Sequence, residues 1–401
     1  MEFDPYSDDY WNGAYTTYRW LRDEAPVYRS ERRDFWALSR YDDVHAGLLN
    51  YTTFSSAQGV MLDQLNTPGF NSERDLPGFL IGTDPPLHQQ LRSLVNRSFS
   101  ARTVESLEGA VRKAVRRYLD RLSGQSGFDF CAEFANRVPA EVLYDLMGVP
   151  EADRDLVFSY NEDWNDVGEP GAEGSPPSER HLQGAANMFR YVAELAALKR
   201  EHPADDLISE IVQKSIVRPN GVSGPLDAAE LGGFLLTVLG AGVETTTKML
   251  AAAMVAFFRH PDEWRKLRAD PSKIPQAVEE IGRYDPPLHY MGRKSAVDVT
   301  LHGVTVPAGS NVLLLIGSAN RDDRAFPDPD RFDIERSLTK LPLTFGSGPH
   351  TCLGAALARL EMRVALEEIC IEWPEFEIDE SGLVRARTFN TAGFTRVPIS
   401  V

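Results

Sequence analysis

Apolar residues recur every three or four positions along most of the chain, which is the spacing of amphipathic and buried helices. The longest such segment is Ala228–Arg259. Asp227 and Glu230 have the spacing of a capping box at its start, and His260 and Pro261 end it. About 32 residues at 1.5 Å each span roughly 48 Å. Because the first half is apolar nearly all round, we predict a long buried helix that crosses the protein.

Shorter segments of the same periodicity predict further helices, short apolar runs predict strands, and segments rich in proline and glycine predict loops at 57–81 and 166–178. No linker interrupts them, so we expect a single domain, residues 1–401, mainly α with a minor β part. The predicted helices are 11–24, 41–49, 87–99, 101–123, 131–147, 179–201, 205–213, 261–269, 276–284 and 353–372, and the predicted strands are 27–28, 35–39, 299–306 and 311–316.

Composition narrows the class of protein. Of 401 residues, 42% are hydrophobic and 25% charged, which is typical of a globular enzyme with a large core. The net charge of −17 disfavours nucleic acid as a partner, because phosphate binding needs a basic face. The acidic start resembles no signal peptide, and 3 distant cysteines favour a reducing compartment. The most apolar run, residues 231–243, is shorter than the roughly 20 residues of a bilayer span, so we expect a soluble, cytoplasmic protein without a membrane anchor.

The most informative cysteine is Cys352, which lies in a glycine-rich turn directly before the predicted helix 353–372. A helix N-terminus favours negative charge, so we expect the pKa of this thiol to be lowered and the thiolate to be available as a metal ligand. Zinc and iron–sulfur sites need several ligands, and Cys131 and Cys370 are far away in sequence. Haem needs only one protein ligand. The alternative is a buried, inert cysteine in a glycine-rich turn.

Polar residues interrupt the long apolar helix at Glu244, which is followed by three threonines. Gly240 and Gly242 weaken the helix just before them. The threonines can donate to carbonyls one turn earlier, with Glu244 reaching the surface or an arginine. A carboxylate beside hydroxyls in a buried helix is equally consistent with a catalytic role. The helix alone leaves both interpretations open.

The turn around Cys352 has the pattern Phe-Gly-x-Gly-x-His-x-Cys-x-Gly, which resembles the haem-binding loop of the cytochrome P-450 superfamily. The matching residues are Phe345, Gly346, Gly348, His350, Cys352 and Gly354. The resemblance implies haem b (iron protoporphyrin IX) with Cys352 as its axial thiolate ligand, Phe345 packed near the sulfur and His350 at a haem propionate. It also implies the cytochrome P-450 fold, a triangular helical prism with the haem between the distal helix 228–259 and the proximal helix 353–372.

The long helix carries a second matching motif. Ala241-Gly242-Val243-Glu244-Thr245 resembles the oxygen-activating motif of the same superfamily. By that resemblance Thr245 hydrogen-bonds the bound dioxygen species and Glu244 relays protons toward it. Ala241 and Gly242 would face the haem and leave space for oxygen.

Further matches occur in the expected order along the chain. His88 and Arg92, at i and i+4, resemble a helix start that binds haem propionates, and Arg293 matches another propionate-binding arginine. With His350 they would satisfy two buried carboxylates, whereas each alone would be an ordinary surface residue. The pair Glu280 and Arg283 is by itself a weak signal, but in the superfamily it forms a buried network with a later arginine, for which Arg336 is the candidate.

The resemblance implies a haem-thiolate monooxygenase that inserts one oxygen atom from O2 into a hydrophobic small molecule. The sequence contains no flavin, nicotinamide or iron–sulfur motif, so ferredoxin and ferredoxin reductase are the implied electron donors. The acid–threonine pair favours dioxygen over peroxide. The alternatives are a haem-thiolate enzyme of other chemistry, such as a peroxygenase or a ring-coupling enzyme, and a non-catalytic haem sensor. Candidate ferredoxin contacts are Arg102, Arg112, Lys113, Arg116 and Arg359.

By analogy, the substrate is enclosed by residues 58–81, the loop near Asp166, residues 235–241, 288–291 and 390–394. Their side chains predict an apolar pocket in which His289 and Tyr290 orient a polar end of the substrate. The apolar candidates are Met61, Leu62, Phe79, Leu235, Leu288, Met291 and Phe394.

Overall fold

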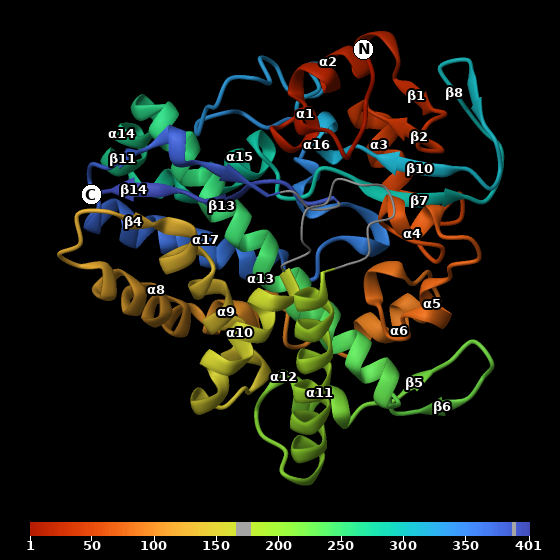
Figure 1. Ribbon diagram of the computed structural model, residues 1–401, viewed down its shortest axis with the longest axis horizontal. Helices are drawn as coiled ribbons and strands as arrows, with labels where there is room; N and C mark the ends of the chain where they lie inside the picture. The colour runs from red at the N-terminus through yellow and green to blue at the C-terminus, as the bar shows by residue number, and fades with distance from the viewer. Residues whose placement is uncertain (166–177, 387–389) are drawn as a thin grey trace.

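The predicted long helix, α13 (Ala228–Arg259), begins and ends at the predicted residues. The Asp227 carboxylate accepts from the backbone N–H groups of Ala229 and Glu230, and the Glu230 carboxylate accepts from the N–H of Asp227, which completes the capping box. The computed structural model describes residues 1–165, 178–386 and 390–401, and in it α13 runs diagonally across the molecule (Figure 1). Most of the predicted loop 166–178 lies outside the described residues.

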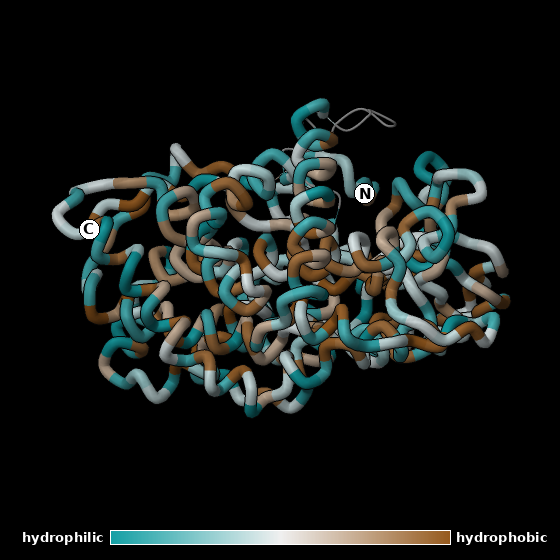
Figure 2. The backbone as a smooth tube through the Cα atoms, turned by 90° about the horizontal axis from the view of Figure 1, so that it is seen from below, coloured by the Kyte–Doolittle hydropathy of each residue, from teal (hydrophilic) through white to brown (hydrophobic). Residues whose placement is uncertain are grey.

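Within the described residues, α13 is the one helix that is long and apolar enough to cross a membrane by length and composition. Every residue from Thr246 to Phe257 is buried against other parts of the protein, as in the core helix of a globular fold. In Figure 2, hydrophobic stretches gather in the middle of the molecule and hydrophilic ones lie along its rim. The C-terminal half of α13 is therefore packed inside the protein, whereas the 18-residue stretch that meets the membrane criterion is 44% buried.

Helices make up most of the described chain, which confirms the predicted fold class. Besides α13 they are α1 (Asp8–Trp11), α2 (Tyr15–Glu24), α3 (Tyr41–Leu49), α4 (Leu62–Asn66), α5 (Ser72–Asp75), α6 (Leu87–Ser93), α7 (Ala101–Ser106), α8 (Glu108–Leu122), α9 (Arg137–Met147), α10 (Arg154–Asn165), α11 (Glu179–Glu201), α12 (Leu207–Val212), α14 (Pro261–Ala269), α15 (Ile274–Tyr284), α16 (Ile316–Ala319) and α17 (Ala355–Glu372).

The strands form one larger sheet and several small ones. The larger sheet has the order β1-β2-β10-β7-β3, in which β10 pairs parallel with β2 and antiparallel with β7. The strands are β1 (Val27–Ser30), β2 (Phe35–Leu38), β3 (Phe54–Ser55), β4 (Phe128–Asp129), β5 (Ile216–Val217), β6 (Ser223–Gly224), β7 (Met291–Ser295), β8 (Val299–Leu301), β9 (Val304–Val306), β10 (Asn311–Leu314), β11 (Glu377–Ile378), β12 (Val384–Arg385), β13 (Phe394–Arg396) and β14 (Pro398–Ser400).

Local backbone chemistry explains most differences from the predicted elements. The first predicted helix is split because Gly13, with φ +96°, separates α1 from α2. The predicted helix 101–123 is likewise two helices, which meet at Leu107. The predicted loop 57–81 contains the short helices α4 and α5. Helix α10 was not predicted, because its apolar residues Leu156, Val157 and Phe158 are consecutive rather than spaced three or four apart.

Two hydrophobic cores meet along α13. Its C-terminal half, from Met249 to Phe257, packs in one core with α8, α14, α15 and α17. Its N-terminal half, from Leu231 to Val243, packs in the other with α9, α10, α11 and α12. Glu244 and Thr245 lie at the junction, so the fold places the polar interruption of α13 between two packed blocks rather than inside either one.

Candidate functional site

The glycine-rich turn holds Cys352 by backbone hydrogen bonds and close packing. The Cys352 N–H donates to the Phe345 carbonyl at 2.8 Å, and α17 begins three residues later, at Ala355. Gly346 and Gly348 have φ +67° and +72°, a region that favours glycine. A Cβ on Gly348 would lie 2.8 Å from the Leu48 carbonyl oxygen, so a larger residue would push the turn away from α3.

The Cys352 side chain is exposed, yet surrounding protein atoms desolvate the sulfur. Burial raises the pKa of the thiol above its ordinary value, while the Gly354 N–H and the charges of Arg92 and Arg359 oppose that rise. The expected lowering of the pKa by the helix N-terminus is therefore wrong for the protein alone, because desolvation outweighs the local dipole and charges. A bound metal ion would favour the thiolate over the thiol.

Four predicted cationic or hydrogen-bonding residues meet beside this turn. The rings of His88, on α6, and His350 lie 4.4 Å apart between centroids. Arg92 Nη1 donates to the carbonyls of Pro349 and Thr351 at 3.2 and 2.7 Å, which fixes the turn to α6. Arg293 lies on β7 and is 2% exposed. The structure thus brings together residues that are far apart in sequence.

Two of these groups are buried, and each keeps one nitrogen without a hydrogen-bond partner among the described residues. These nitrogens are Arg293 Nη2 and His88 Nδ1. Burial lowers the pKa of Arg293 to about 10, with Asp84 opposing it. Burial, helped by the neighbouring cations, lowers the pKa of His88 to about 4 and that of His350 to about 2. The arrangement would be stabilised by an anionic group that accepts from both unsatisfied nitrogens.

The polar residues of α13 have defined partners. Thr245 Oγ1 donates to the Ala241 carbonyl at 2.9 Å, as one of the two sequence interpretations allowed. Glu244 reaches no arginine among the described residues, and its Oε1 accepts from Thr391 Oγ1 at 2.9 Å. Ala241 is exposed, although its neighbours Leu239 and Val243 are buried. A Cβ added to Gly242 would lie 3.0 Å from Leu143 of α9, so a larger residue there would press on α9.

Sequence reasoning did not single out Glu361, a buried acid that joins α17 to α13. Its side chain is 2% exposed and forms a hydrogen bond with Thr246. Burial raises its pKa well above the ordinary value, and the bond with Thr246 opposes that rise. The sequence offers one indication that Glu361 is buried, because it lies between the apolar residues Leu360 and Val364 of the predicted helix.

The predicted ion network is present near α15. Glu280 accepts from Arg283 Nε at 2.7 Å and from Arg336 Nε at 3.1 Å, and the three side chains are 1%, 0% and 8% exposed. Asp333 N–H also donates to Glu280, and Arg283 donates to the Asn320 carbonyl. Each charge is therefore paired and hydrogen-bonded, as buried charges require. The network fixes α15 to the segment that leads to Cys352.

The predicted substrate contacts fall into separate groups. Met61, Phe79, Leu288 and Met291 pack in one cluster beside the larger sheet. Leu62, His289 and Tyr290 are completely buried among the N-terminal aromatic residues. His289 Nδ1 pairs with the Tyr18 hydroxyl at 3.0 Å and the Tyr290 hydroxyl accepts from Leu62 N–H, so the predicted contact of these two polar groups with a substrate is not supported. Leu235 and Phe394 belong to the two helical cores, and Asp166 lies outside the described residues.

The residues predicted to contact ferredoxin differ in their exposure and in whether they form ion pairs. Arg112 is half-buried between Glu108, Glu367 and Glu368, and it joins α8 to α17. Arg116 shares Glu368, and Arg359 pairs with Glu279 and covers the Phe345 ring at 4.2 Å. Arg102 and Lys113 are exposed and form no ion pair within the described residues. These last two are the cations best placed to meet a partner.

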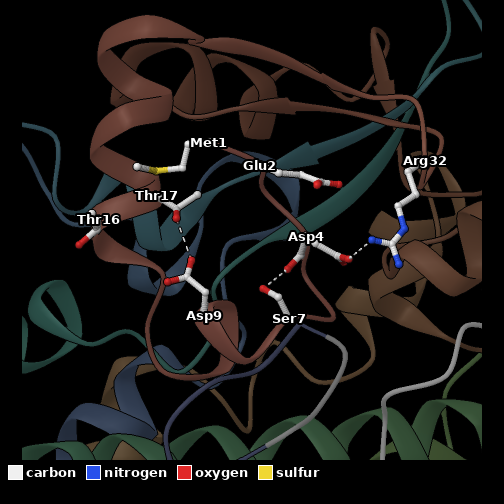
Figure 3. Close-up of a pocket in the computed structure, with 8 residues that line it drawn as sticks. All are labelled: Met1, Glu2, Asp4, Ser7, Asp9, Thr16, Thr17 and Arg32. Atoms are coloured by element: carbon white, nitrogen blue, oxygen red, sulfur yellow. Dashed lines mark hydrogen bonds and ion pairs between the residues drawn. The ribbon is translucent and has the colours of Figure 1, made fainter.

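A separate pocket of about 470 Å³ lies at the N-terminal surface and is shown in Figure 3. Thr17 donates to Asp9 at 2.8 Å, and Arg32 lies 3.9 Å from Asp4. The pocket contains none of the predicted site residues. Its lining residues are Met1, Glu2, Asp4, Ser7, Asp9, Thr16, Thr17 and Arg32.

Comparisons with known proteins place the chain among relatives of similar length and fold. The family model described as Cytochrome P450 matches residues 187–379. Cytochrome P450 123 of Mycobacterium bovis is 39% identical over 401 residues, covering 100% of this chain and 97% of the relative. Cytochrome P450 130 of Mycobacterium tuberculosis is 36% identical over 410 residues, with the same coverage. The bacillaene polyketide synthase cytochrome P450 PksS of Bacillus subtilis has a TM-score of 0.87 at 30% identity, covering 100% of this chain and 99% of that one.

The chain belongs to the cytochrome P450 family. It is a monooxygenase of that family, whose members carry haem with a cysteine thiolate ligand. The residues present fit such a group. Cys352 is a free cysteine at the end of the turn, and the unsatisfied nitrogens of Arg293 and His88 fit the haem carboxylates.

Proposed function

We propose that this protein inserts one oxygen atom from O2 into a hydrophobic small molecule, with haem b held by Cys352 and electrons from ferredoxin and ferredoxin reductase. The observation that carries the proposal is the convergence of buried Arg293 and His88, each with an unsatisfied nitrogen, beside the turn that presents Cys352. Neither helix packing nor turn formation requires these two side chains there.

Haem would be held from two sides by this chain. Cys352 would supply the thiolate ligand, with Phe345 and Gly354 beside it, and the turn glycines Gly346 and Gly348 would leave no side chain to obstruct the haem. His88, Arg92, Arg293 and His350 would bind the two carboxylates. The bound haem would supply the activation of O2, and the protein would orient it and exclude water.

Proton delivery is the role of the polar residues of α13. Glu244 and Thr245 adjoin the exposed Ala241, at the junction of the two cores. The Thr245 hydroxyl can exchange its bond to the Ala241 carbonyl for a bond to a ligand, and Glu244 can pass a proton toward that hydroxyl. Glu280, Arg283 and Arg336 keep a structural role, since they fix the segment before the Cys352 turn.

The substrate side is apolar. Met61, Phe79, Leu288 and Met291 gather in one cluster, which favours a lipophilic substrate. Relatives with similar chains include a vitamin D(3) 25-hydroxylase of Pseudonocardia autotrophica, which is 33% identical over 411 residues, and a mutant of P450 EryK solved with erythromycin B, at TM-score 0.85 and 32% identity. We therefore propose a sterol-like, fatty or polyketide compound, oxidised in the cytoplasm of a bacterium.

The direct test is spectroscopic and catalytic. The purified protein should bind one haem, and its alkaline pyridine adduct should identify haem b. Its ferrous carbonyl adduct should show the red-shifted band of a thiolate ligand, and Cys352→His should abolish that band. Vitamin D3, erythromycin B and hexadec-9Z-enoic acid should be screened for the absorbance shift that accompanies loss of a water ligand. A protein that folds normally but binds no haem would refute the proposal.

The electron source separates the alternative functions. With a surrogate ferredoxin, its reductase and NADPH, a monooxygenase consumes O2 in step with hydroxylated product. A peroxygenase would form product from hydrogen peroxide without these partners, and a haem sensor would form none. Thr245→Ala should retain haem while diverting electrons to hydrogen peroxide, and unchanged coupling would refute the role given to Thr245.

A further inference from the structure

Thr391 connects the acid of α13 to the apolar substrate side. Its Oγ1 donates to Glu244 Oε1 at 2.9 Å, and its backbone pairs with Leu288 in an antiparallel bridge. The side chain is mostly buried, with 8% exposure. One residue of the C-terminal segment therefore contacts both the predicted proton donor and a predicted substrate wall.

The segment around Thr391 is held on both sides. Toward the substrate wall, His289 N–H donates to the Asn390 carbonyl and Ala392 N–H donates to the Pro287 carbonyl, each at 2.9 Å. Toward α13, Gly393 lies against Lys248, because an added Cβ would be 2.8 Å from Lys248 Cβ. These contacts fix the backbone of Thr391, so its hydroxyl meets Glu244 at a defined position.

The described hydrogen bonds of Glu244 and Thr245 point to different partners. Thr245 donates to the Ala241 carbonyl, and Glu244 accepts from Thr391. No hydrogen bond joins Glu244 to Thr245 in the part of the chain that is described. Transfer of a proton from Glu244 toward Thr245 therefore requires the carboxyl group either to reorient or to donate through Oε2 while Oε1 keeps its bond with Thr391.

We infer that Thr391 is a positioning residue for Glu244, and that its backbone bridge to Leu288 makes the position of the acid sensitive to a substrate packed on that wall. A hydroxyl that donates to a carboxylate forms a stronger bond than a neutral pair, so it can hold the acid in one orientation until the wall shifts. The inference rests on the proposed role of Glu244 in proton delivery.

Turnover tests this with matched variants and the screened compound that shifts the haem spectrum most. Thr391→Val removes the hydroxyl at nearly constant shape. It should lower product per NADPH by about 3- to 10-fold, raise hydrogen peroxide and change the solvent isotope effect, with an unaltered ferrous carbonyl band. Thr391→Ser should restore coupling. Thr395→Val, which removes an exposed hydroxyl on β13 that donates to Val384, is the control and should couple normally.

Glu244→Gln separates the two possible failures. If Glu244→Gln couples normally, the proposed role of Glu244 is wrong. If Glu244→Gln uncouples but Thr391→Val does not, the inference about Thr391 alone is wrong.

A measurement without turnover tests the contact itself. Thr391→Val should lower the urea midpoint of unfolding more in the native background than in the Glu244→Leu background, because the partner carboxylate is absent from the latter. Equal shifts in both backgrounds would overturn the inference.

Discussion

Glu361 of α17 and Thr246 of α13 are joined by a side-chain hydrogen bond between the helix that follows Cys352 and the helix that carries Glu244. Glu361 is an acid in an apolar interface and has a strongly raised pKa. The contact between the two helices therefore depends on the protonation of one carboxyl group.

The first prediction concerns pH and stability. Because the pKa of Glu361 is higher in the folded than in the unfolded chain, its contribution to stability is complete below about pH 4.5 and is lost as pH rises toward the folded pKa. The loss is at most about 1.4 kcal/mol per pH unit. Glu361→Gln should therefore gain stability relative to the native protein between about pH 5 and about pH 7 in urea unfolding. The control is Glu375→Gln, at an exposed position. If the stability of Glu361→Gln and of the native protein changed with pH in the same way, the raised pKa would be contradicted.

A second prediction compares neighbouring acids on α15. Glu280→Gln leaves two buried guanidinium groups without a carboxylate, and should cost about 3–5 kcal/mol of unfolding free energy. Glu279→Gln breaks only the more exposed pair with Arg359 and should cost less than about 1 kcal/mol. Urea unfolding of both variants measures the difference, and equal losses would show that burial of the network is unimportant.

A third prediction concerns electron transfer. Arg112 is a poor choice for charge reversal, because it holds three glutamates between α8 and α17. Arg102→Glu with Lys113→Glu should instead lower the rate of haem reduction by ferredoxin about 10-fold at low salt and weaken its salt dependence. Arg265→Glu, at an exposed position on α14, should have little effect. An unchanged rate in the double variant would place the ferredoxin contact elsewhere.

A fourth prediction concerns the turn that presents Cys352. Gly348→Ala combines a positive φ with a Cβ too close to the Leu48 carbonyl, so we expect a cost of about 1–3 kcal/mol and a reduced haem content. Gly109→Ala lies in α8 with no atom within 4 Å of the added Cβ, and should instead stabilise by about 0.5–1 kcal/mol. Haem absorbance per protein and urea unfolding check both, and full haem content at native stability in Gly348→Ala would contradict this account of the turn.

The sequence was most informative where local chemistry decides the structure. The ends of α13 follow from its capping box and from Pro261, and the turn before α17 follows from its glycines. The sequence could not reveal partners contributed by distant segments. Thr391 belongs to no recognisable motif, and it contacts Glu244 only because the fold brings together two segments that are far apart in sequence.

Burial also changed two chemical expectations. His289 was predicted to orient a polar end of the substrate. The N-terminal aromatic residues enclose it instead, and its Nδ1 forms a hydrogen bond with the Tyr18 hydroxyl. The pKa of Cys352 was predicted to be lowered by the helix dipole, whereas burial of the thiol raises it. Neither effect has a local signature in the sequence.

Because α13 is divided between two hydrophobic cores, its two halves meet at a boundary formed by Glu244 and Thr245. Because each half packs in its own core, we expect the block with α10 and α11 to open separately from the block with α17. Amide exchange should then proceed in two cooperative steps, with Leu231 to Val243 opening at lower free energy than Met249 to Phe257. Ligand entry and cofactor retention would thus be governed by different halves of one helix.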